Sequence, residues 1–167
     1  MRAPALIFLA GLAVSAAACA TVEPATTSPS PVAEGPAPLA GHDWFYHQDE
    51  GEARLAYGVA ESDDLRLGFD CAKGGGRLRL SALGGPNSKP EIQLESGGEI
   101  QRFPALAEPS QLHDGDLLTA EAAADAPVFE RFRRVGWIAL WQDGEREAYA
   151  PHPHSRPNIE RFFAFCG

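Results

Sequence analysis

The sequence is poor in basic residues and has no long apolar run. Lys and Arg number 14 against 23 Asp and Glu, so the 167-residue chain has a formal net charge of −9. A chain of this charge lacks the positive surface that a phosphate backbone requires, which excludes nucleic acid as an expected partner. The apolar stretch at residues 3–14 is shorter than the ~20 residues of a membrane-spanning helix. We therefore expect no transmembrane helix.

Patterns of common catalytic and cofactor sites are also missing. The chain has no G-x-S-x-G segment for a nucleophilic serine, no phosphate-binding G-x-x-x-x-G-K segment and no H-E-x-x-H zinc helix. His152 and His154 flank Pro153 and are the one pair with the character of metal ligands. Two histidines are fewer than the three or four ligands of a usual zinc site. The sequence therefore predicts no catalytic residue and no cofactor, and it favours a non-enzymatic protein.

Residues 1–18 have the order of an export signal, with Arg2 followed by an apolar stretch and then by small residues. The segment Ala16-Ala17-Ala18-Cys19 resembles the lipobox of bacterial lipoproteins, whose cysteine is lipid-modified and becomes the first residue of the mature chain. The resemblance implies lipidation of Cys19. Because Ala20 is not the Asp that retains such proteins in the inner membrane of enteric bacteria, it also implies an outer-membrane lipoprotein facing the periplasm. An ordinary signal peptide without a lipid is the alternative.

Residues 19–41 are predicted to form a tether. Five prolines lie there among Ala, Thr and Ser, with few large aliphatic side chains. Such a segment buries too little apolar surface to offset its ordering entropy, and its prolines favour an extended polyproline II conformation. We therefore assign residues 1–18 to the signal, 19–41 to the lipid-anchored tether and 42–167 to a single domain.

Two cysteines remain in the predicted domain, Cys71 and Cys166. An exported protein enters a compartment that permits disulfides, and one pair allows one connectivity. Both cysteines are flanked by apolar residues, which favours burial over a reactive exposed thiol. We predict a Cys71–Cys166 disulfide that closes a loop of about 95 residues, for which the chain-entropy model gives ~4–5 kcal/mol.

Alternation of apolar and polar residues recurs through the domain and predicts β-strands with one buried face. It places Leu67, Phe69 and Cys71 on the inward face of one strand. Gly97-Gly98 and Asp143-Gly144 are typical of two-residue hairpin turns. Strands are expected at 44–47, 53–59, 65–71, 77–80, 92–95, 99–103, 137–141 and 145–150, whereas 117–122 fits either a strand or a helix.

Two short helices are expected, near 126–135 and 157–166. Asp125 is a candidate N-cap of the first helix, which should end before Gly136. The second carries an apolar stripe at positions i, i+3, i+4 and i+7. The expected fold is a mainly β domain, an antiparallel β-sandwich or an open barrel, with the C-terminal helix covering one edge or face. The members of the stripe are Ile159, Phe162, Phe163 and Cys166.

A second pattern combines three features: repeated Leu-x-Leu segments, Cys71 at the end of a strand, and the closing Phe162-x-x-x-Cys166. In these features the domain resembles the invasion-associated locus B group of small exported bacterial proteins. The resemblance implies a small exported β domain. No functional residue is transferred from it.

Trp137 and Trp141 should share one face of their strand, because side chains two and four residues apart point the same way. The residues between them are also apolar, so this segment is a central strand, or one of its faces is covered by a helix or by a partner. We take the two tryptophans as a candidate binding surface. The sequence thus favours a membrane-anchored periplasmic lipoprotein that acts as a binding or adaptor module for a protein or an envelope component such as the cell wall. A small envelope hydrolase, or a carrier of a metal or small ligand using His152 and His154, is the alternative.

Overall fold

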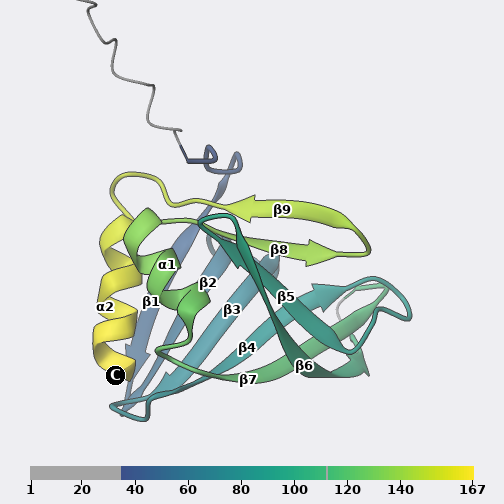
Figure 1. Ribbon diagram of the computed structural model, residues 1–167, viewed down its shortest axis with the longest axis horizontal. Helices are drawn as coiled ribbons and strands as arrows, with labels where there is room; N and C mark the ends of the chain where they lie inside the picture. Colours follow the sequence, from purple (N-terminus) through teal and green to yellow (C-terminus); the bar gives the residue numbers. More distant parts are fainter. Residues whose placement is uncertain (1–34, 112) are drawn as a thin grey trace, which may run out of the picture. The chain divides into compact units, whose positions relative to one another are not determined.

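The computed structural model describes residues 35–111 and 113–167. The predicted signal segment, Cys19 and residues 20–34 of the predicted tether lie outside the described residues. The described chain is mainly β, with one helix in mid-chain and one at the C-terminus, so this prediction is confirmed (Figure 1). The elements are β1 His42–Asp49, β2 Glu52–Val59, β3 Leu65–Ala72, β4 Arg77–Gly84, β5 Glu91–Ser96, β6 Glu99–Pro109, β7 Asp116–Ala123, α1 Pro127–Val135, β8 Ile138–Gln142, β9 Glu145–Tyr149 and α2 Arg156–Cys166.

All nine strands form one antiparallel sheet in the order β1-β2-β3-β4-β7-β6-β5-β8-β9. The 11-residue strand β6 pairs with β5 along its first half and with β7 along its second half, so it carries the sheet around a corner. The sheet curls until its two edge strands, β1 and β9, approach each other. The result is a nearly closed barrel, and the ambiguous segment at 117–122 is the strand β7.

Tight hairpins explain much of this order. Three connections have two central residues with positive φ: Glu50-Gly51, Gly97-Gly98 and Asp143-Gly144. Positive φ at both positions defines the type I′ turn, whose twist matches that of the flanking strands. The two hairpins expected from sequence are confirmed, and Glu50-Gly51 adds a third that joins β1 to β2.

The inward faces of the strands and helices pack into one aromatic core. The indole ring of Trp44 has its centroid 5.2 Å from Tyr57, 5.7 Å from Phe69 and 5.1 Å from Phe132. These rings are fully buried. Because Trp44 comes from β1 and Phe132 from α1, the contacts tie the first strand to the mid-chain helix.

Each helix lies against a different part of the sheet, α1 on β5 and β6, and α2 on β1 and β2. The expected stop of α1 is confirmed, since Gly136 follows the helix with a φ of 84°. The expected N-cap is wrong: Ala126, not Asp125, occupies that position. The side chain of Gln101 on β6 supplies an acceptor there, because its Oε1 lies 3.3 Å from the backbone N–H of Val128. A residue from a distant strand therefore replaces the local cap.

The predicted disulfide between Cys71 and Cys166 is confirmed, with Cα atoms 5.7 Å apart. It joins the end of β3 to the end of α2. Two backbone hydrogen bonds reinforce the link, because the N–H groups of Gly74 and Gly76 donate to the carbonyls of Phe165 and Cys166 at 2.9 and 2.8 Å. The turn between β3 and β4 thus binds the last carbonyls of the C-terminal helix.

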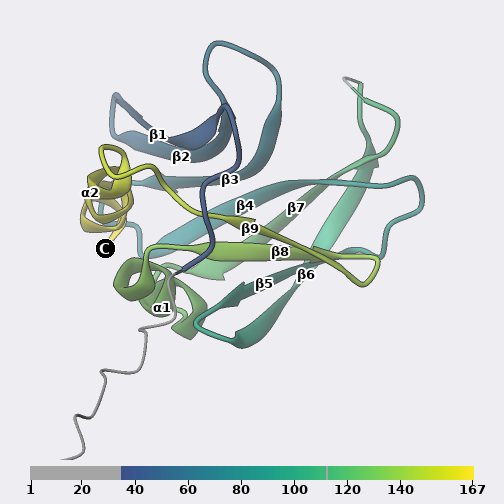
Figure 2. The same cartoon turned by 90° about the horizontal axis from the view of Figure 1, so that it is seen from above.

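Residues 35–41, which we call the strap, lie against the domain (Figure 2). The backbone N–H of Leu39 donates to the hydroxyl of Tyr57 at 3.1 Å. Further back, the strap passes so close to Trp137 that a Cβ on Gly35 would stand 2.9 Å from the indole Cδ1. Composition alone assigned these seven residues to the tether; in the structure they pack on the fold, so the folded unit begins before His42.

Candidate binding face

Trp141 lies on β8 and Trp137 directly precedes this strand; both are partly exposed. Between them, Ile138 and Leu140 point inward and are buried at 0% and 3% exposure. Period-two alternation therefore divides this strand into an aliphatic face toward the core and an indole face toward solvent.

A carboxylate on the neighbouring strand binds the indole of Trp141 directly and reaches Trp137 through Arg146. The side chain of Glu95 on β5 is only 11% exposed. Its Oε2 accepts hydrogen bonds from Trp141 Nε1 and from Arg146 Nε, each at 2.7 Å, and its Oε1 accepts one from Arg146 Nη2 at 3.0 Å. The Arg146 guanidinium lies 5.2 Å from the ring centroid of Trp137. We call these four residues, Glu95, Trp137, Trp141 and Arg146, the tryptophan face.

The charges of this face stabilise each other. The hydrogen bonds from Arg146 hold the pKa of the Glu95 carboxyl below its ordinary value, even though burial acts in the opposite direction. Glu95 in turn raises the pKa of Arg146. A pair that donates through two nitrogens has a defined geometry as well as a favourable energy. The Glu95–Arg146 pair therefore contacts both indoles, Trp141 through a hydrogen bond and Trp137 through the guanidinium.

The sequence analysis did not identify Glu95 or Arg146 as part of this face, although the hairpin turn before β9 indicated the position of Arg146. The two-residue turn at Asp143-Gly144 places Trp141 directly opposite Arg146 on β9. The partner strand β5 has no such local marker, because it pairs with β8 across 46 residues of chain between Glu95 and Trp141. That pairing is set by the whole sheet.

Each tryptophan lines its own hollow. The hollow at Trp141 has a volume of about 310 Å³ and a rim of polar side chains from β5, β8 and the loops beside them. The hollow at Trp137 has a volume of about 350 Å³, and Pro36 of the strap forms part of its wall. Its other main lining residues are Pro151, His152, Pro153 and Arg156. The strap therefore forms one side of the second hollow.

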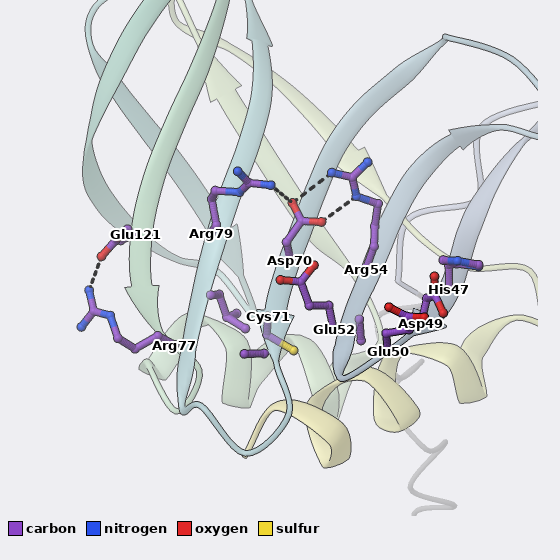
Figure 3. Close-up of a pocket in the computed structure, with 13 residues that line it drawn as sticks. His47, Asp49, Glu50, Glu52, Arg54, Asp70, Cys71, Arg77, Arg79 and Glu121 are labelled. Carbon is purple, nitrogen blue, oxygen red and sulfur yellow. Dashed lines mark hydrogen bonds and ion pairs between the residues drawn. The ribbon is translucent and has the colours of Figure 1, made fainter.

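A larger, open hollow of about 870 Å³ lies over β2, β3, β4 and β7 (Figure 3). Its floor is a row of side chains in register across the four strands, Arg54, Asp70, Arg79 and Glu121. Asp70 pairs with Arg54 at 2.6 Å and with Arg79 at 3.4 Å. Charges of alternating sign neutralise one another here, and exposed ion pairs contribute little to stability. This row is a solvated surface of the sheet.

His152 and His154 lie in the loop before α2, with ring centroids 6.0 Å apart. Asp43 organises this loop: its Oδ1 accepts from the backbone N–H of His152 at 3.1 Å and from the hydroxyl of Ser155. His154 Nε2 stands 3.3 Å from the second oxygen of Asp43. Within residues 35–111 and 113–167, no group of three or more His, Cys, Asp or Glu side chains is arranged to hold a metal ion.

Neither of the described helices, α1 or α2, is long and apolar enough to cross a membrane.

Comparisons with known proteins add no relative. No family model, no curated protein and no solved structure matches the chain.

Proposed function

We propose that this chain is a lipid-anchored binding protein of the bacterial cell envelope, which faces the periplasm and holds an envelope component on its tryptophan face. The role is non-enzymatic. The observation that carries the proposal is the pair of partly exposed indoles, Trp141 bonded to Glu95 and Trp137 packed against Arg146, each bordering a hollow.

Two properties of the face support binding. Indole side chains supply large contact areas at a low cost in conformational entropy, and Trp and Arg are the residues most often central to binding surfaces. The hydrogen bonds to Glu95 lower that entropic cost further, since the indole of Trp141 is already oriented before any ligand arrives. A preorganised surface of this kind suits recognition.

The proposed anchor is tested by labelling cells with a fatty acid. The wild-type chain should incorporate the label and Cys19→Ser should not. Equal incorporation by both chains would remove the lipoprotein assignment, leaving an ordinary exported protein.

The binding face is tested by crosslinking in the cell. A photo-crosslinking amino acid at Glu145, an exposed position of β9 beside the face, should capture an envelope component. The same group at Leu106, a 71% exposed position of β6, serves as the matched control. Trp141→Ala should abolish capture from position 145. Equal capture from both positions, or capture unaffected by the alanine variant, would contradict the proposed face.

A further inference from the structure

The hollow beside Trp141 combines one aromatic wall with a polar rim. Its volume of about 310 Å³ is at the small end of the range for ligand sites, which is the size for a ligand of one or two rings. The rim belongs to β5, to the β8–β9 turn and to the loop after β4. The side chains of the rim that can form hydrogen bonds are Ser88, Lys89, Glu91, Gln93, Gln142 and Asp143.

The indole of Trp141 offers this hollow an apolar surface. Its single polar atom, Nε1, donates to Glu95, so only ring carbons remain for contact with a ligand. The same bond fixes the plane of the ring. A rigid apolar plane beside polar groups matches a ligand with one C–H face and a polar edge.

Ser88 provides the second observation. Its hydroxyl oxygen is buried and has no hydrogen-bond partner among the described residues. A buried hydroxyl without a partner costs free energy, and such groups in native structures call for an explanation. Because Ser88 lines the hollow, rotation of its side chain toward a bound hydroxyl group would supply the missing partner.

Two amides at the rim form hydrogen bonds through their nitrogens. Gln93 donates through Nε2 to Glu91 Oε1 at 2.6 Å, and Gln142 donates through Nε2 to the carbonyl of Leu83. These bonds fix both amide planes, while each Oε1 keeps its capacity to accept. The rim thus presents two oriented acceptors and the Ser88 hydroxyl around one aromatic ring.

We propose that this hollow binds a neutral pyranose ring of a saccharide. The C–H face of the sugar packs on the Trp141 indole, and its hydroxyl groups bond to Ser88, Gln93 and Gln142. The lining has one lysine, Lys89, against two carboxylates, Glu91 and Asp143, and the chain carries a net charge of −9, so an acidic sugar is disfavoured. The inference rests on the proposed function, because it names the ligand class for one end of the tryptophan face.

The direct test titrates the purified full-length chain with neutral trisaccharides, N-acetylglucosamine trimer and maltotriose, and follows binding by calorimetry. We expect saturable binding of at least one of them. Trp141→Leu and Gln93→Leu should weaken it at least tenfold, and Leu106→Ala should leave it unchanged. The titration uses each sugar at about 10 mM, a concentration high enough to detect millimolar affinity. If neither sugar gives a binding heat, the proposal is overturned.

Ser88→Ala separates binding from folding. Removing an unpartnered buried hydroxyl breaks no intramolecular hydrogen bond, so the variant should melt at or above the wild-type temperature. Saccharide affinity should nevertheless fall about threefold or more. Unchanged affinity in Ser88→Ala together with unchanged affinity in Gln93→Leu would overturn the assignment of this hollow, whatever the stability of the Trp141 variant.

Two further measurements identify the source of the sugar and distinguish a failure of the saccharide proposal from a failure of the proposed function. Co-sedimentation with insoluble cell-wall glycan, displaced by soluble trisaccharide, would identify the wall as the source. Trisaccharide binding without co-sedimentation would support the same chemistry from another envelope glycan. Capture from position 145 that depends on Trp141, combined with no sugar binding, would overturn the saccharide proposal and leave the binding face intact.

Discussion

The indole Nε1 of Trp44 donates a hydrogen bond to the carbonyl oxygen of Tyr149, 3.3 Å away, and joins the two edge strands of the sheet. The rings of Tyr57 and Tyr149 pack across the same seam with centroids 4.8 Å apart. Asn158 of α2 donates to the carbonyl of Trp44 at 3.0 Å. Side chains and a helix therefore bridge the gap between the two edge strands, where backbone pairing stops.

Trp44→Phe tests this closure. The variant keeps an aromatic ring but loses the hydrogen bond and part of the buried indole, so the free energy of unfolding should fall by about 2–3 kcal/mol. Urea unfolding followed by circular dichroism measures it. Phe45→Leu is the control, because Phe45 is the next residue and is 41% exposed on the opposite face. Equal losses in the two variants would contradict a special role for the seam.

Removal of the disulfide should have a larger effect. Replacing Cys71 and Cys166 together by alanine releases a constraint over 95 residues, and the expected loss is about 4 kcal/mol in the chain-entropy model. The measurement is the urea midpoint of the double variant against that of the wild type under non-reducing conditions. Reductant should lower the wild-type midpoint toward that of the variant and leave the variant unchanged. If reductant leaves the urea midpoint of the wild type unchanged, even after the chain has been unfolded in its presence, the disulfide is contradicted.

Local patterns predicted the elements well, and long-range pairing set the rest. The alternation around Phe69, the stripe around Phe162 and the turn at Asp143-Gly144 depend on near neighbours, and all three are confirmed. The choice of a barrel depends on strand order, since β4 pairs with β7 and β5 with β8. No short window of sequence contains those pairings.

The same limit applies to the site. Alternation was sufficient to put Trp137 and Trp141 on one face, because their spacing is local. Glu95 lies 46 residues before Trp141, so no local pattern links the two. The row of Arg54, Asp70 and Arg79 can be identified only when the register of three strands is known. The strap was assigned to the tether because its composition resembles the preceding segment, whereas its neighbours in the structure, Tyr57 and Trp137, are far away in the sequence.

Asp43 should be structural rather than catalytic. Its Oδ1 accepts hydrogen bonds from the N–H groups of Trp44 and His152 and from the hydroxyl of Ser155. Asp43→Ala leaves these donors without an acceptor and should destabilise the fold by about 2–4 kcal/mol. Asp43→Asn keeps an acceptor oxygen and should lose less than half as much in urea unfolding. Equal losses in the two variants would contradict the role of Asp43 as a shared acceptor.

Glu95 should make stability depend on pH in the acid range. Its hydrogen bonds from Arg146 lower the folded-state pKa, so the folded state binds a proton less readily than the unfolded state does. The stabilisation is therefore complete above the ordinary carboxyl pKa of about 4.3 and is lost as the pH falls through the lower folded-state value. Glu95→Gln should cost about 2 kcal/mol at pH 7, because it leaves Arg146 without its carboxylate.

The difference between Glu95→Gln and wild type should shrink as the pH falls below 4.3, the unfolded carboxyl value, because a protonated Glu95 carries no more charge than glutamine. Urea unfolding at a series of pH values measures this difference. Glu121→Gln is the matched control: its ion pair with Arg77 has an N–O distance of 2.6 Å, but the Glu121 side chain is 71% exposed. Exposed pairs contribute little, so this variant should follow the wild type at every pH. A difference for Glu95→Gln that stays constant across the range would mean that packing of the side chain, and not its charge, holds the tryptophan face.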